Sequence, residues 1–178
     1  EKTWLPYQNE VLPEGFEYEF DVMVVDWQKY IQRALDLGAK RIVAHIDMFN
    51  DEDIDTLIAL LTPYDAFLGL SVSNDKDVAL FARRVNSVSL LYSKVFIQVM
   101  GIIKIGAQGQ PFDEGVVDRI AYLKKECRNI GIQVDGSMNP ETMFKVKSAG
   151  AACAVIGSYI FKTENVKERI ESLRENFR

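Results

Sequence analysis

The sequence predicts an α/β fold built on one parallel sheet. Apolar segments of strand length alternate strictly with segments of helical periodicity from about residue 17 onward. The chain has 178 residues, of which 48% are hydrophobic, and this fits one domain with a full core. Polar and glycine residues follow the strand-like segments, where parallel sheets bind ligands. We therefore treat residues 1–178 as a single domain.

Six pairs of strand and helix are expected after an irregular lead-in over residues 1–16. The expected strands are 18–25, 41–47, 66–72, 95–102, 132–134 and 152–156, and the expected helices are 27–37, 51–61, 75–85, 114–129, 140–149 and 164–177. Asn139 followed by Pro140 is typical of a helix start, and Gly150 is typical of a helix end. Strict alternation implies right-handed helical crossovers, so the strands should all run parallel.

The number of units predicts a barrel. A complete (β/α)₈ barrel has about 250 residues, and each unit of strand and helix takes roughly 30. Two more units would bring this chain close to that length. We therefore predict a TIM (β/α)₈-type barrel of which this sequence carries six units, strands three to eight, with the first two strands outside it. Without those strands, segments 18–25 and 152–156 would be unpaired edges, which natural proteins avoid.

Charge and cysteine content restrict the function. With 21 basic and 26 acidic side chains the net charge is -5, which argues against nucleic acid or an anionic membrane as a partner. We find no apolar run of about 18 residues and no signal peptide. Cys127 falls on an expected helix and Cys153 on an expected buried strand, so we expect two reduced core thiols and a cytoplasmic protein.

Two strings near the C-terminus resemble a known family. VDGSMNPET, from Val134 to Thr142, resembles the V-D-G-G-I-N-P-E-T of strand seven in the ribulose-phosphate 3-epimerase family, and GSYIF, from Gly157 to Phe161, resembles its strand-eight G-S-x-[IV]-F. EFDVMV, from Glu19 to Val24, is similar to the family's third strand, L-D-V-H-L-M-V. The similarity spans nearly the whole chain and is strongest from Val95 to Phe161.

The resemblance implies that Asp135 is the catalytic residue. It matches the strand-seven aspartate that binds the metal and exchanges a proton with the sugar carbon beside the carbonyl. Such an epimerisation passes through an enediolate and needs two acid–base groups and an electrophile. The structural alternative is an aspartate that only caps the next turn. Asn139 already occupies the cap position, which favours the functional interpretation.

Other residues are placed in the sugar and metal site by the same resemblance. Asp21 stands where the family has a metal-binding histidine, and a carboxylate there favours harder ions; the alternative is an acidic residue paired with a nearby base. The expected cofactor is a divalent ion, Zn, Mn, Mg or Fe, held by Asp135 and Asp21.

His45 and Asp47 should share one face of a strand, and His45 is expected to line the pocket rather than to bind metal. Met23 and Met100 match family methionines of the sugar site, but barrel packing explains them equally well.

A phosphate site is expected from glycine-rich loops. The segment from Gly106 to Phe112 resembles the family's loop six, N-P-G-F-G-G-Q-x-F, whose backbone N–H groups would surround a phosphate oxygen. In many barrels the loops after strands seven and eight contribute as well. The hydroxyl of Ser137, at a family glycine position, would either donate a hydrogen bond or crowd the pocket. The expected phosphate-binding residues are Gly106, Ala107, Gln108, Gly109, Gly136, Ser137, Gly157 and Ser158.

The resemblance therefore predicts an isomerase that inverts C3 of a phosphorylated sugar such as D-ribulose 5-phosphate through a metal-stabilised enediolate. One alternative is another phosphate-binding barrel enzyme, of decarboxylase or aldolase type. A second alternative is a catalytically inactive barrel that binds a phosphorylated ligand or acts as a scaffold. A homo-oligomer is left open.

Overall fold

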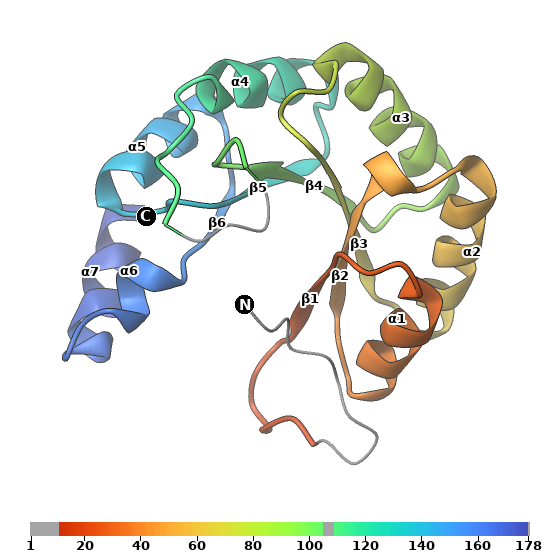
Figure 1. Cartoon of the computed structure of the whole chain (residues 1–178), viewed down its shortest axis with the longest axis horizontal. Coiled ribbons are helices and arrows are strands. Elements are labelled where there is room, and N and C mark those ends of the chain that lie inside the picture. The colour runs from red at the N-terminus through yellow and green to blue at the C-terminus, as the bar shows by residue number, and fades with distance from the viewer. Residues whose placement is uncertain (1–10, 105–108, 178) are drawn as a thin grey trace.

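A computed structural model describes residues 11–104 and 109–177 as a six-stranded parallel sheet with helices between successive strands. The sheet is curled, and its helices lie on the convex side (Figure 1). The strands are β1 (Glu19–Val22), β2 (Arg41–His45), β3 (Phe67–Val72), β4 (Val95–Met100), β5 (Gly131–Asp135) and β6 (Cys153–Val155). The helices are α1 (Trp27–Asp36), α2 (Asp51–Leu61), α3 (Val78–Leu91), α4 (Val116–Glu126), α5 (Pro140–Ala149), α6 (Ser158–Phe161) and α7 (Val166–Phe177), with 3₁₀ turns η1 (Ile46–Met48) and η2 (Thr62–Tyr64).

Strands pair in chain order from β1 to β6, and each pair is parallel. The predicted α/β alternation with one parallel sheet is therefore confirmed. Several boundaries were wrong: α3 begins at Val78 because Asp77, rather than an earlier residue, accepts hydrogen bonds from the amides of Ala79 and Leu80. The short helix α6 and both 3₁₀ turns were not predicted.

The end of β2 corrects the expectation that His45 and Asp47 share a strand face. β2 ends at His45, and the chain turns into η1. Asp47 instead accepts hydrogen bonds from the amide and hydroxyl of Ser73, at 2.9 and 2.6 Å. Asp47 thus holds the β3–α3 loop and does not form a side-by-side pair with His45.

The convex face of the sheet is apolar and packs against the helices. Alternate strand residues such as Ile42, Leu70 and Ile97 are fully buried there in one core cluster. Burying each such side chain contributes roughly 1.5–3 kcal/mol before the cost of ordering it. This layer fixes the strands and hence the positions of the residues at their carboxyl ends.

The concave face carries a hydrogen-bonded polar layer. Arg41 pairs with Glu19 at 2.5 Å and donates to Gln133 at 2.9 Å, while the Gln133 amide donates to Glu19 at 2.6 Å. The Arg41 guanidinium also lies 3.9 Å from the centre of the Phe96 ring. Glu19 is on β1 and Gln133 on β5, so these contacts cross the concave side and show how strongly the sheet is curled.

β6 differs from the buried strand that its apolar sequence predicted. Cys153, on the concave face in register with Gln133, is exposed, because β6 has a paired neighbour only on its β5 side within the described residues. The prediction of a buried core thiol is therefore wrong for Cys153 and confirmed for Cys127, which is buried at the end of α4.

Within residues 11–104 and 109–177, no helix combines the length and apolar character needed to cross a membrane.

Candidate functional site

Asp135 lies at the carboxyl end of β5, on the concave face of the sheet. Burial raises the pKa of its carboxyl from the ordinary 3.8 to about 6, with further contributions from the negative charges of Asp21 and Glu19. A hydrogen bond from the Gly136 amide and the nearby His45 oppose the rise. A carboxyl with this pKa can both accept and donate a proton near neutral pH, which suits general acid–base chemistry.

Asp21 and His45 form a contact on the same face. The His45 Nε2 atom lies 2.9 Å from one Asp21 oxygen, and the Gln98 amide donates to the other oxygen at 2.8 Å. His45 is only 5% exposed. Both oxygens of Asp21 are therefore held by protein groups, and its negative charge lies close enough to Asp135 to raise the pKa of that carboxyl.

Gln98 was missed by the sequence analysis. Its Nε2 atom donates to Asp21, and its Oε1 atom accepts from Gln133 at 2.9 Å, so it joins the polar layer to the residues at the strand ends. A signal was available, since Gln98 is the one polar residue in the apolar segment VFIQVM. A buried amide of this kind is tolerated only when its hydrogen bonds are satisfied.

The two predicted methionines lie in different surroundings. Met100 is buried at the end of β4, in register with Asp135, and therefore faces the same concave side. Met23 follows the end of β1 and is 47% exposed.

The loop after β4 lies against the turn after β5. The Gly101 amide donates to the Asp135 carbonyl at 2.6 Å, and the Ser137 hydroxyl donates to the Gln110 carbonyl. Gly109 is exposed and has a φ of 71°, a backbone conformation that favours glycine. The other three predicted loop residues, Gly106, Ala107 and Gln108, lie outside the described residues. Asp135 and the described part of this loop thus share one end of the sheet.

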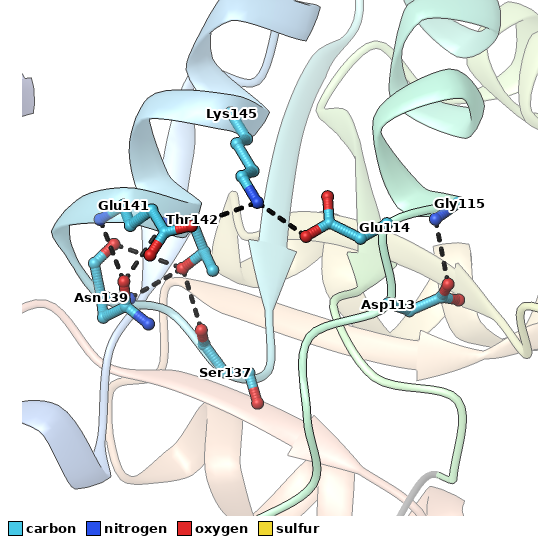
Figure 2. A network of polar contacts seen from close by, with 8 residues as sticks. All are labelled: Asp113, Glu114, Gly115, Ser137, Asn139, Glu141, Thr142 and Lys145. Carbon is cyan, nitrogen blue, oxygen red and sulfur yellow. Dashed lines mark hydrogen bonds and ion pairs between the residues drawn. The ribbon is translucent and has the colours of Figure 1, made fainter.

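The turn from β5 to α5 is fixed by side-chain caps (Figure 2). The Asn139 side chain accepts from the amides of Glu141 and Thr142, and the Thr142 hydroxyl donates to the Ser137 carbonyl at 2.9 Å. Gly136 and Ser137 both have positive φ, 113° and 54°. The predicted start of α5 at Asn139 and Pro140 is confirmed, and so is its end at Gly150. These hydrogen bonds fix the backbone of Ser137 in the turn that connects β5 to α5.

Gly157 and Ser158 follow β6 and begin the four-residue helix α6. Both are exposed, and the Gly157 carbonyl accepts from the amides of Ile160 and Phe161. They lie at the carboxyl end of their strand, as Asp135 does on β5.

The described residues offer few ligands for a divalent metal. Among residues 11–104 and 109–177, no group of three or more His, Cys, Asp or Glu side chains could hold a metal ion. Zinc sites in proteins usually use three or four protein ligands, whereas Mg²⁺ is often held by one or two carboxylates together with water. Asp21 and Asp135 alone therefore fall short of a three-ligand set within the described residues.

Sequence comparisons point to one family. The family model described as "Ribulose-phosphate 3 epimerase family" matches residues 9–161. The chain is similar to the cytoplasmic isoform of ribulose-phosphate 3-epimerase from Oryza sativa subsp. japonica, with 27% identity over 87% of this chain and 66% of the relative. It is also similar to ribulose-phosphate 3-epimerase from Aquifex aeolicus, with 26% identity over 86% of this chain and 67% of the relative. This chain thus spans about two thirds of the length of these relatives.

Solved structures with the same fold include enzymes with other reactions. A 3-hexulose-6-phosphate synthase matches with a TM-score of 0.64 and 20% identity over 83% of this chain and 67% of that one. Orotidine 5'-monophosphate decarboxylase from Sulfolobus solfataricus matches with a TM-score of 0.65 and 18% identity over 89% of this chain and 71% of that one. At these identities the similarity concerns the fold alone.

Proposed function

This chain belongs to the ribulose-phosphate 3-epimerase family, and we propose that it inverts C3 of a ketose phosphate, converting D-ribulose 5-phosphate to D-xylulose 5-phosphate. The observation that carries the proposal is the position of Asp135. Its carboxyl has a raised pKa of about 6 and lies at the strand end where the glycine-containing loop meets the β5–α5 turn. We place the reaction in the cytoplasm, since neither cysteine forms a disulfide.

Asp135 acts as the acid–base group on one face of the substrate. Its carboxylate takes the C3 proton, the electrons of the C–H bond move into an enediolate, and a proton returns to C3 from the opposite face. The opposite-face group is supplied by a strand outside the described residues. Asp21 and Glu19 support this role because their charges add to the effect of burial, which raises the pKa of Asp135 to about 6.

Backbone amides hold the substrate phosphate. The proposed site consists of the loop after β4, including Gly106, Ala107, Gln108 and Gly109, the turn at Gly136 and Ser137, and the start of α6 at Gly157 and Ser158. Positive φ at Gly109, Gly136 and Ser137 supports it, because such turns can direct successive N–H groups to one side. The Ser137 hydroxyl already donates to Gln110, so its backbone N–H is the donor left for an anion.

A divalent ion, Zn²⁺, Mn²⁺, Mg²⁺ or Fe²⁺, would polarise the enediolate oxygens when bound. Asp135 and Asp21 are the proposed protein ligands. Two carboxylates fall short of a complete ligand set, and residues beyond those described, water or substrate oxygens would supply the rest.

We also propose that two further strand and helix units complete a (β/α)₈ barrel, with residues 1–178 contributing six units to its single domain. The curled sheet supports this, because β1 and β6 each pair on one side only within the described residues. The greater length of the curated relatives supports it as well.

The test is incorporation of solvent deuterium. D-ribulose 5-phosphate is incubated in D₂O with the full-length protein and with Mn²⁺, Zn²⁺ or Mg²⁺ in turn, and C3 is examined by NMR. We expect deuterium at C3 together with D-xylulose 5-phosphate, and neither with Asp135→Asn. Absence of deuterium with every metal would reject the epimerase and favour a catalytically inactive phospholigand-binding barrel. If the protein instead releases carbon dioxide from a different sugar phosphate, or cleaves one, in a separate incubation, a decarboxylase or an aldolase is favoured.

A further inference from the structure

Two side chains outside the proposed site hold the base of the loop between β4 and α4. The Asn74 amide nitrogen, from the β3–α3 loop, donates to the Met100 carbonyl at 2.7 Å, to the Ile102 carbonyl at 3.2 Å and to the Asp113 carboxylate at 3.1 Å. One amide group therefore contacts both the first and the last described parts of the 101–115 loop.

Arg119 on α4 holds Asn74 in turn. Its Nη2 atom donates to the carbonyls of Asn74 and Lys76, each at 2.6 Å. The guanidinium thus fixes the β3–α3 backbone to α4, and Asn74 presents its amide to the neighbouring loop from a fixed backbone. We call the side chains of Asn74 and Arg119 the loop clamp.

The loop clamp is connected by backbone hydrogen bonds to the proposed catalytic residue. The Asp113 amide donates to the Gly101 carbonyl at 2.9 Å, and the Gly101 amide donates to the Asp135 carbonyl at 2.6 Å. Any shift of the loop base must therefore move or break the contact to the backbone of Asp135.

Stability alone explains the loop clamp poorly. The buried atoms Asn74 Oδ1 and Arg119 Nη1 have no hydrogen-bond partner among the described residues. A cavity of about 430 Å³ borders both side chains. Buried unpaired polar atoms are unfavourable, and in native structures they are often kept for a functional reason.

We propose that Asn74 and Arg119 are positioning residues that set the distance between Asp135 and an anionic group bound at Gly109, Gly136 and Ser137. The inference rests on the proposed function, because it assumes that the loop binds the substrate phosphate. Neither residue touches the reacting atoms in this scheme. Both act by fixing the backbone on which the phosphate and the acid–base carboxyl depend.

The experiment compares Asn74→Ala and Asn74→Asp with Asn86→Ala in the full-length protein. Asn86 is a matched control, since its side-chain amide also donates to a backbone carbonyl of a neighbouring element. It joins α3 to the carbonyl of Glu126 at the C-terminal end of α4, away from the 101–115 loop. We expect both Asn74 variants to weaken inorganic phosphate binding about tenfold and to raise KM for D-ribulose 5-phosphate in parallel. The decrease in kcat should be smaller than the rise in KM. Asn86→Ala should leave the dissociation constant of phosphate unchanged.

Amide hydrogen exchange gives a second readout that needs no activity. The amides of Gly101 and Asp113 should exchange faster in the Asn74 variants and in Arg119→Met, whose side chain has no N–H to donate to the carbonyls of Asn74 and Lys76. If the variants keep the wild-type affinity for phosphate and the wild-type exchange rates, the proposed positioning role of the loop clamp is wrong.

The two hypotheses fail in different ways. Wild-type protein that binds phosphate but incorporates no deuterium rejects the epimerase alone, and the loop clamp is then judged by phosphate affinity and exchange. Wild-type protein that binds no phosphate overturns both.

Discussion

At the scale of single residues, Asp135 illustrates how a fold maintains an unfavourable charge. The carboxyl is partly buried beside Asp21 and Glu19, and its pKa rises from 3.8 to about 6. Between these two values the folded protein binds more protons than the unfolded chain. The free energy of unfolding therefore falls as pH rises through that interval, and the full cost is present above about pH 6.

Asp135→Asn should accordingly stabilise the protein at pH 8, by about 2 kcal/mol, while stability near pH 4 should change little. Asparagine has nearly the same shape and cannot ionise. Urea unfolding at both pH values, in buffer containing a chelator, measures the difference. Equal destabilisation at both values would contradict the charge argument. The same variant should lose deuterium incorporation, so that stability and activity change in opposite directions.

Ser137 combines a costly backbone conformation with a useful hydroxyl. Its φ of 54° costs a non-glycine residue about 1–2 kcal/mol, and its hydroxyl donates to the Gln110 carbonyl. Ser137→Ala loses the hydrogen bond and keeps the strain, so we expect a loss of about 1 kcal/mol. Ser137→Gly loses the same bond and relieves the strain, so its stability should be close to that of the wild type. Thermal unfolding of the two variants provides the comparison, and equal loss in both would contradict it.

At the scale of elements, Gly101 allows two loops to approach closely. A Cβ atom added there would lie 2.1 Å from the Gly136 carbonyl oxygen, which is a backbone atom and cannot move by rotating a side chain. The same residue donates to the Asp135 carbonyl. The β4–α4 and β5–α5 loops therefore depend on glycine at this position.

Gly101→Ala should separate these loops, with a cost of about 1–3 kcal/mol and a larger relative loss of deuterium incorporation. Gly131→Ala is the control, because an added Cβ at this glycine, the first residue of β5, would meet no atom within 4 Å. Urea midpoints and exchange rates of both variants measure the two effects. A wild-type rate in Gly101→Ala would show that the close approach is not needed.

Helix starts could be predicted where the local sequence contains the cap. Asn139 and Pro140 mark α5 because the stabilising contacts lie within three residues of each other. The start of α3 was placed too early, at Asp75, because Asp75 and Asp77 offer similar capping chemistry. Only Asp77 accepts hydrogen bonds from two amides, those of Ala79 and Leu80. Local sequence identifies candidate caps, and tertiary packing selects among them.

At the scale of the whole molecule, some residues of the candidate site can be recognised from the local sequence, whereas others depend on contacts between distant parts of the chain. Asp135 could be predicted because strand ends in a parallel sheet are recognisable and a family string surrounds it. The contact between Glu19 and Gln133 could not be predicted from the sequence, because it joins positions 114 residues apart across the concave face of the sheet. The partners of Gln98 and Asn74 could not be predicted for the same reason, since they lie on other strands and loops, although the polar Gln98 within an apolar strand was itself a signal.

The curl of the sheet also determines the state of its edges. β6 has one paired neighbour among the described residues, and Cys153 is exposed on its concave side. In a closed barrel the concave positions form a packed interior, so the two strands that we propose would cover this thiol. Cys127 is buried in the helical layer and should not respond to closure.

Thiol labelling can therefore report barrel closure. In the 178-residue chain, Cys153 should react readily with an aromatic disulfide reagent, and Cys153→Ser should abolish the fast reaction. In the full-length protein the same cysteine should react at least about tenfold more slowly, because labelling then requires local opening of the barrel. Equal reactivity of Cys153 in the two proteins would mean that the edge of β6 stays open, and the eight-unit barrel would have to be abandoned. Cys127 serves as the internal reference in both, since its burial between helices does not depend on the missing neighbours of β6.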